Sequence, residues 1–192
     1  GVVTVQATTI TGTASAIAAV YVANTAGTVT GLGNEAVTIS DTGAISASDL
    51  NSIDAATSGA VNATTITGLT GTASALKTAY ASTTVSGLGN EAVTVTDTSI
   101  DAADIATLDT NTTGVVTVQA ATITGSATAI VSAYAADTAD TVAGLGDEAV
   151  TISDTGTIAV TDLNTIDAAT TGAVNAAAVT GLTGTATAIN TA

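Results

Sequence analysis

Two acidic residues recur at matching places along the chain, and their type and spacing suit metal binding. A glutamate stands in the stretch GLGNEAVTISDTG at Gly31–Gly43, and an aspartate follows it six residues later. The stretch returns as GLGNEAVTVTDTS at Gly87–Ser99 and as GLGDEAVTISDTG at Gly144–Gly156. Carboxylates from adjacent turns of a repeat could share a hard cation such as Ca²⁺. The candidate calcium ligands are Glu35, Asp41, Glu91, Asp97, Glu148 and Asp154.

A second interpretation of these acids needs no metal. Asp between Ser or Thr and a following Thr at the end of a strand is also an ordinary turn, in which the carboxylate accepts hydrogen bonds from backbone N–H groups. The glycine- and aspartate-rich nonapeptide of calcium-binding β-helices (GGxGxD) is absent from the sequence. We therefore favour the turn and expect no cofactor, with structural calcium as the open alternative.

The residue inventory predicts that the chain is not an enzyme. It holds no His and no Cys, and Lys77 is its one basic residue, so most acid–base, nucleophilic and phosphoryl-transfer schemes lack their residues. The GLG turn lacks the third glycine and the following helix of a dinucleotide fingerprint. A carboxylate pair for glycoside hydrolysis is formally possible. Sugar sites, however, usually need aromatic platforms, and Tyr21, Tyr80 and Tyr134 stand at spacings typical of a core.

Charge and composition narrow the partners and the class of protein. The net charge of −15 repels nucleic-acid phosphates and anionic lipid headgroups, so we expect neither as a partner. The longest apolar run, Ala16–Ala23, is far shorter than the roughly 20 residues of a spanning helix, so no membrane span is expected. The hydrophobic fraction of 46% is ample for a core, and its small branched side chains suit a narrow, layered one.

The chain consists of internal sequence repeats. Its glycines divide the 192 residues into units 1–58, 59–113, 114–171 and 172–192, the last of them partial. The unit that begins at Gly1 aligns without a gap with the unit that begins at Gly114, and 41 of the 58 positions are identical. We interpret the chain as a single domain of tandem repeats. Because it has no initiator Met or signal segment and stops within a unit, we expect a processed product or a part of a longer chain.

Within a unit, segments with the helical spacing of apolar residues alternate with segments that are typical of strands. Residues 47–59, ASDLNSIDAATSG, have helical spacing with a capping residue at each end, and TGTASAIAAVY is a second helical segment. Runs rich in Val, Thr and Ile, such as Val2–Ile10 and Val61–Ile66, are typical of strands, as is the alternation around Val37 and Ile39. Each unit is thus expected to hold helix, strand, helix and strand.

These elements predict an α/β solenoid, made of stacked helix–strand coils of about 28 residues with a parallel sheet. One such coil cannot bury its apolar face alone, whereas stacked copies share a continuous core. The alternative is an all-β parallel β-helix in which the Ala-rich stretches form a third strand face. Ala is a poor strand former, and the caps fit helices, so the helix-containing coil is favoured.

The repeats also carry a resemblance. The stretches DLNTIDAATTGAV, VTGLTGTATAI and GLGNEAVTISDT resemble tandem-repeat segments of very long, acidic surface or secreted proteins of bacteria. The resemblance covers essentially the whole chain and implies an adhesin-like or fibre-like role outside the cell or at its surface. It brings no catalytic residue with it.

Two functions from different classes follow. The first is a structural segment of an extracellular or cell-surface fibre or stalk that associates head to tail with other copies of itself. No polar capping repeat precedes Gly1, so the first strand is expected to offer an open edge, with Val3 and Val5 as the self-association residues. The alternative is an adhesive binding module, either a calcium-stabilised adhesin repeat or an ice-binding face made by rows of Thr.

Overall fold

The computed structural model describes residues 1–190 and shows helices that alternate with pairs or triplets of short parallel strands. The helices begin where the sequence offers a cap: the side chains of Thr13, Thr72 and Ser126 each accept a hydrogen bond from a backbone N–H in the first turn that follows. Ala dominates their interiors and favours helix. The helices are α1 (Ala14–Thr25), α2 (Ala47–Ala56), α3 (Ala73–Ala81), α4 (Ala102–Asn111), α5 (Ala127–Thr138), α6 (Val160–Ala169) and α7 (Ala186–Ile189).

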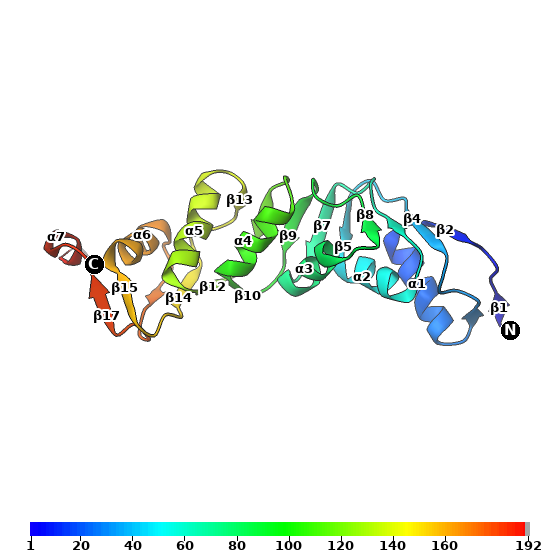
Figure 1. The fold of residues 1–192 in the computed structure, drawn as a ribbon, viewed down its shortest axis with the longest axis horizontal. Coiled ribbons are helices and arrows are strands. Elements are labelled where there is room, and N and C mark those ends of the chain that lie inside the picture. The colour runs from blue at the N-terminus through cyan, green and yellow to red at the C-terminus, as the bar shows by residue number, and fades with distance from the viewer. Residues whose placement is uncertain (191–192) are drawn as a thin grey trace. The chain divides into compact units, whose positions relative to one another are not determined.

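The chain folds as two compact units. Unit 1 comprises Gly1–Thr94 together with the short segment Asn111–Gly114. Unit 2 comprises Val95–Thr110 and the chain from Val115 onward. The order of helices and strands along the chain is marked in Figure 1. The boundary between the two compact units, after Thr94, lies inside the second sequence repeat, 59–113.

Unit 1 contains three sets of strands. β1 pairs in parallel with β3, and a four-stranded parallel sheet has the order β2-β4-β6-β8. A third set has the order β5-β7-β9, and the first three residues of β9 belong to this unit. The strands are β1 (Val3–Thr4), β2 (Thr9–Gly12), β3 (Val29–Thr30), β4 (Ala36–Ile39), β5 (Ala44–Ser46), β6 (Val61–Asn62), β7 (Gly68–Gly71), β8 (Val85–Ser86) and β9 (Ala92–Val95).

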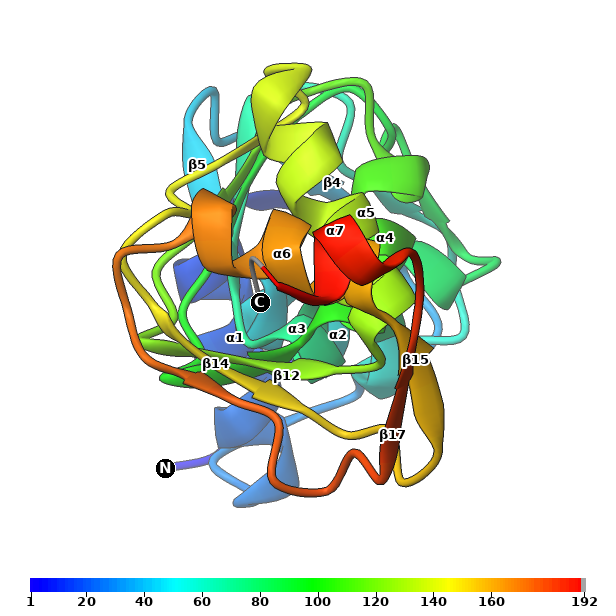
Figure 2. The ribbon, with the colours of Figure 1, turned by 90° about the vertical axis from the view of Figure 1, so that its left-hand side faces the viewer.

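Unit 2 repeats this pattern. Its four-stranded parallel sheet has the order β10-β12-β14-β16, and two further parallel pairs are β11 with β13 and β15 with β17. Figure 2 shows β15 and β17 side by side, next to α6 and α7. The strands are β10 (Ser99–Asp101), β11 (Val116–Val118), β12 (Thr122–Gly125), β13 (Val142–Ala143), β14 (Ala149–Ile152), β15 (Thr157–Ala159), β16 (Val174–Asn175) and β17 (Gly181–Thr183).

The core of each unit is a stack of matched branched side chains. In unit 1, Val37 lies between Ile10 and Val61 in the strand register, and the row continues to Val85. In unit 2 the equivalent row is Ile100, Ile123, Val150 and Val174. Helix α1 packs on α2 and α2 on α3, whereas in unit 2 α5 packs on α6 (Figure 1). Within each unit, neighbouring parallel strands therefore bury their apolar residues in matched rows.

The structure confirms the α/β class and the parallel strands, and it corrects several finer expectations. The all-β alternative is wrong, because the Ala-rich stretches are helices. The run Val61–Ile66 is not one strand: Asn62 Oδ1 accepts a hydrogen bond from Thr64 N at 3.0 Å and bends the chain after β6. Likewise Val2–Ile10 contains β1 and only the beginning of β2. Each complete sequence repeat holds five strands beside its two helices, whereas the sequence predicted two strands.

No helix within residues 1–190 has the length and apolar character that crossing a membrane requires.

Candidate functional site

The recurring GLG turns place a glutamate side chain inside the protein. Gly31 and Gly33 have φ of +89° and +138°, which non-glycine residues rarely adopt. A Cβ on Gly31 would also collide with the carbonyl oxygen of Val5. The turn delivers Glu35 to the start of β4 with 0% of its surface exposed. An ionised side chain so buried must be paired or fully hydrogen-bonded.

Tyr21, on helix α1, supplies the main partner. Its hydroxyl donates a hydrogen bond to Glu35 Oε1, and both side chains are buried. The other carboxylate oxygen, Oε2, accepts hydrogen bonds from the backbone N–H groups of Gly33 at 2.9 Å and Asn34 at 3.1 Å. The turn thus binds the side chain of the residue that follows it, and the helix holds the same carboxylate from its other side.

The backbone of Glu35 joins the turn to the next coil. The buried Thr57 hydroxyl donates to the carbonyl oxygen of Glu35 at 2.7 Å and accepts from the N–H of Gly59 at 3.0 Å. A Cβ on Gly59 would collide with that same carbonyl oxygen. We refer to the four residues Tyr21, Glu35, Thr57 and Gly59 as the first Tyr–Glu–Thr cluster.

The cluster occurs three times with the same geometry. Each copy has a Tyr hydroxyl on Oε1 of a glutamate that is at most 2% exposed, and a Thr hydroxyl 2.7 Å from the glutamate carbonyl oxygen. The second cluster, in unit 1, comprises Tyr80, Glu91, Thr112 and Gly114. The third, in unit 2, comprises Tyr134, Glu148, Thr170 and Gly172.

The electrostatics of the first cluster favour an ionised Glu35 beside a neutral Tyr21. Burial, and then the hydrogen bond to the carboxylate, raise the pKa of Tyr21, Tyr80 and Tyr134 well above the ordinary 10.0. Burial by itself would raise the pKa of Glu35. The Tyr21 hydroxyl and the backbone N–H groups together outweigh burial and hold that pKa below the ordinary 4.5. The pair is therefore a charge-assisted hydrogen bond in one protonation state.

The hydrogen bonds of each Tyr–Glu–Thr cluster join separate segments of the chain. No family model, curated protein or solved structure matches the chain. In each cluster the carboxylate accepts hydrogen bonds from donors of the protein itself, and the cluster joins a helix, a turn and the segment after the next helix.

Two of the three aspartates of the calcium prediction, Asp41 and Asp154, accept a hydrogen bond from the start of a helix. Asp41 Oδ2 accepts a hydrogen bond at 2.7 Å from Ala14 N, the first residue of α1, and Asp154 does the same for Ala127 at the start of α5. Asp97 is half-buried just after β9. Together with Asp49, Asp41 lines a hollow of about 160 Å³.

These acids are not gathered into a metal-binding group. Within residues 1–190 no three acidic side chains lie close enough together to hold one ion. Glu35, Glu91 and Glu148 lie in the clusters, apart from the aspartates at the helix starts. Calcium binding therefore stays a prediction.

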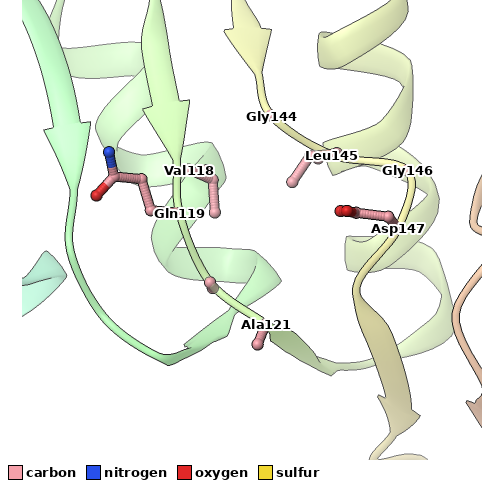
Figure 3. Close-up of a pocket in the computed structure, with 8 residues that line it drawn as sticks. Val118, Gln119, Ala121, Gly144, Leu145, Gly146 and Asp147 are labelled. Atoms are coloured by element: carbon pink, nitrogen blue, oxygen red, sulfur yellow. The ribbon is translucent and has the colours of Figure 1, made fainter.

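A larger hollow of about 710 Å³ lies in unit 2 between two neighbouring coils (Figure 3). One wall is the turn Gly144–Asp147 and the other is Val118–Ala121, where the β11–β13 pair has ended and the β12–β14 pair begins. The side chains of Leu145 and Asp147 extend toward the opposite wall, whereas Gln119 points away from it. The lining contains one charged group and no aromatic ring.

The threonine rows of the ice-binding alternative are short. Thr11 of β2 and Thr38 of β4 are in register and exposed, but the row continues as Asn62 and Ser86. In unit 2, Thr124 and Thr151 are in register between Asp101 and Asn175. Two threonines in line do not make the regular array that this alternative needs.

The predicted self-association residues lie in and beside β1. Val3 is 60% exposed, and Val5 is half-buried. The N–H group of Val3 donates to Thr28 O, just before β3, at 3.0 Å, and that of Val5 donates to Thr30 O in β3 at 2.8 Å. Backbone groups alternate sides along a strand, so Thr4 carries the N–H and C=O that face the other way.

The Tyr–Glu–Thr cluster is the feature that the sequence interpretation missed. It treated the tyrosines as core residues and the glutamates as possible ligands, without connecting them. A signal was available: the chain has three Tyr and three Glu, one of each per cluster, and every cluster Thr is followed at two residues by Gly. Equal numbers of two rare residue types in matched positions of a repeat indicate pairing.

Proposed function

We propose that this chain is a structural repeat segment of an extracellular or cell-surface fibre or stalk, with its coils stacked as a solenoid. The observation that carries the proposal is the threefold Tyr–Glu–Thr cluster. A motif repeated with every polar atom used inside the protein suits a structural joint, whereas a binding site leaves donors or acceptors for its ligand. With 16 acidic residues and one basic residue, the surface suits neither nucleic acid nor an anionic membrane.

We further propose that copies associate end to end. Equivalent positions of the two sequence repeats that begin at Gly1 and Gly114 support this. Val3 is 60% exposed and its equivalent Val116 is 0% exposed, whereas Val20 is 38% exposed and its equivalent Ala133 is 1% exposed. Val3 of β1 and Val20 of α1 are therefore exposed at positions that the aligned repeat unit buries, and the surface at β1 is apolar like an internal layer. A further coil laid against it would bury this apolar surface at about 25 cal/mol per Å² and pair an open strand edge.

Such a contact joins unlike surfaces, so it extends into a filament rather than closing into a dimer. Repulsion between chains of charge −15 opposes it, and salt weakens that repulsion. The proposal therefore expects filaments that lengthen as the salt concentration is raised. Electron microscopy and light scattering of the purified chain across a salt series measure this directly.

The sharpest variant is Val3→Lys, which places a charge on the proposed contact. Proline at Val3 or Val5 is a poorer choice, because it removes N–H groups that bond to β3. Ser74→Lys, on the exposed side of α3, adds the same charge elsewhere and serves as the matched control. Filaments that form equally well with Val3→Lys and with Ser74→Lys would refute end-to-end association through β1.

A further inference from the structure

Strand β17 exposes an apolar side chain that an earlier repeat of the same sequence buries. Residues 172–192 align without a gap with residues 59–79, and 15 of the 21 positions are identical. Leu182 of β17 is 39% exposed, whereas its equivalent Leu69 of β7 is 0% exposed. Leu182 also lines a hollow of about 300 Å³ whose other lining side chains are mainly apolar. The edge of β17 therefore has the composition of a surface that is covered elsewhere in this chain.

Strand β9 is what covers the equivalent edge of β7. The sheet order places β9 beside β7, on the side opposite to β5, and Ala92 N donates to Thr67 O at 3.1 Å. In a parallel pair this bond sets Val93 beside Leu69, and both side chains are 0% exposed. Among residues 1–190, β17 pairs with β15 alone (Figure 2). The position that corresponds to β9 is therefore open beside β17.

Strand β1 has the sequence pattern and the outward-facing groups that this position requires. Residues 2–5 read VVTV, and β9 reads AVTV. The N–H groups of Val3 and Val5 donate toward β3, so the N–H group of Thr4, between them, faces outward. In β9 the N–H group of Ala92 donates toward β7, so the residue two positions later, the equivalent of Thr4, faces β7 as well. The two strands thus offer matching residues to a neighbour.

We propose that β1 of one copy of the chain lies beside β17 of another copy, in the position that β9 takes beside β7. This inference rests on the end-to-end association proposed above, and it names the surface that receives β1. The register follows from β7 and β9: Val3 lies beside Leu182, and Thr4 lies beside Thr183 with its N–H group donating to Leu182 O. The contact extends the β15–β17 pair and covers Val3 and Leu182, which are 60% and 39% exposed in the single chain.

Two charge variants test this contact from its two sides. Leu182→Lys places a charge on the receiving edge and leaves β1 intact, whereas Val3→Lys does the reverse. Ala168→Lys, on the exposed side of α6, is the control for Leu182→Lys. At a salt concentration at which the wild-type chain forms filaments, we expect each of the two variants to stay monomeric by itself and Ala168→Lys to form filaments.

Mixing the two variants gives the sharper result. An equimolar mixture of Val3→Lys and Leu182→Lys should form a complex of two chains and nothing larger, because it offers one intact β1 and one intact β17 edge to a single junction. Analytical ultracentrifugation measures this as a doubling of mass that neither variant shows alone. A mixture that stays monomeric would overturn the inference.

Disulfide formation measures the register, and it serves if Leu182→Lys does not fold. The chain has no Cys, so a pair of introduced cysteines reports one contact. Residues side by side on neighbouring parallel strands lie about 4.8 Å apart, within the reach of a disulfide. A chain with Thr4→Cys and Thr183→Cys should therefore form covalent multimers on oxidation. Thr4→Cys with Thr180→Cys is three residues out of register, roughly 10 Å, and should not.

The possible outcomes separate this inference from the proposed function. If Leu182→Lys forms filaments as Ala168→Lys does, while Val3→Lys does not, β1 contacts another surface, so the inference fails and end-to-end association stands. Pairs formed by Leu182→Lys alone would overturn it too, because they would show β1 joining β1. A wild-type chain that stays monomeric across the whole salt series would instead refute the association itself.

Discussion

The hydroxyl of Tyr21 donates a hydrogen bond to the carboxylate of Glu35, fourteen residues further along the chain, and both side chains are buried. This one contact ties a helix to the glycine turn that precedes β4. It also gives a role to two rare residue types, because the three tyrosines are the only aromatic residues of the chain and glutamate occurs only three times. The contribution of this contact to the fold can be measured as the change in stability when one of its groups is removed.

Removing a cluster hydroxyl should destabilise the protein. Tyr21→Phe and Tyr134→Phe keep the ring but deprive a buried carboxylate of its strongest donor, so we expect each to lower the free energy of unfolding by about 1–3 kcal/mol. Tyr80→Phe should cost less, because Tyr80 is only half-buried and water can replace its hydroxyl. Urea denaturation of the three variants measures the order, and an equal loss at all three positions would contradict it.

Alkaline pH should unfold the protein through the same contacts. The folded pKa of each cluster tyrosine lies above the ordinary 10.0, so the neutral hydroxyl stabilises the fold. That contribution is complete below pH 10 and is lost as the pH rises above it. Melting temperature should therefore fall steeply above pH 10, in step with tyrosinate absorbance. A Tyr21→Phe variant, with one hydroxyl fewer, should show a shallower fall.

Acid should act through Glu35 in the opposite direction. Its folded pKa lies below the ordinary 4.5, so the stability that it contributes is present above that value and is lost as the pH falls below it. Glu35→Gln should be less stable than the wild-type chain at neutral pH, and its stability should depend less on pH below 4.5. Denaturation at a series of acidic pH values tests this, and parallel curves for the two proteins would rule it out.

Glycine is required where the turn and the next coil touch. Gly59→Ala would place a methyl group against the Glu35 carbonyl oxygen, and we expect a loss of about 1–3 kcal/mol from the forced shift. Gly43→Ala is the control, because a Cβ there meets open space. It should be neutral or slightly stabilising, by up to about 1 kcal/mol. Thermal melts that show the same effect for both variants would refute the contact.

Calcium should matter little for stability. The cluster carboxylates already accept hydrogen bonds from protein donors, and Asp41 and Asp154 each accept one at a helix start. We expect the melting temperature to change by less than about 5 °C on chelation, which for a chain of this length is about 1–2 kcal/mol. A fall of more than about 20 °C would show that the aspartates at the helix starts hold an ion that the fold requires.

The ice-binding alternative has its own measurement. Because the in-register threonines are only two deep in each unit, we expect no thermal hysteresis from the purified chain. Hysteresis that rises with protein concentration would favour a binding face over a structural segment.

The sequence by itself determined the repeat, the helix-and-strand composition and the burial of the branched residues. Helical spacing around Leu50 and Ile53, and alternation around Val37 and Ile39, are local patterns that report which face of an element is apolar. The positive φ at Gly31 and Gly33 is also a local property, because a tight turn that needs such angles selects glycine.

Only the tertiary structure decided how the acids are used. Glu35 follows a turn in sequence, and nothing local indicates that its partner is a tyrosine on the preceding helix and that its carbonyl is bonded by Thr57 of the next coil. Strand boundaries depended on the neighbouring coil in the same way, since a two-residue strand such as β6 exists only because β4 and β8 pair with it. Periodicity records which side of an element is buried. The identity of the residue that it meets depends on how helices and strands far apart in the sequence pack together, and the local pattern does not contain that information.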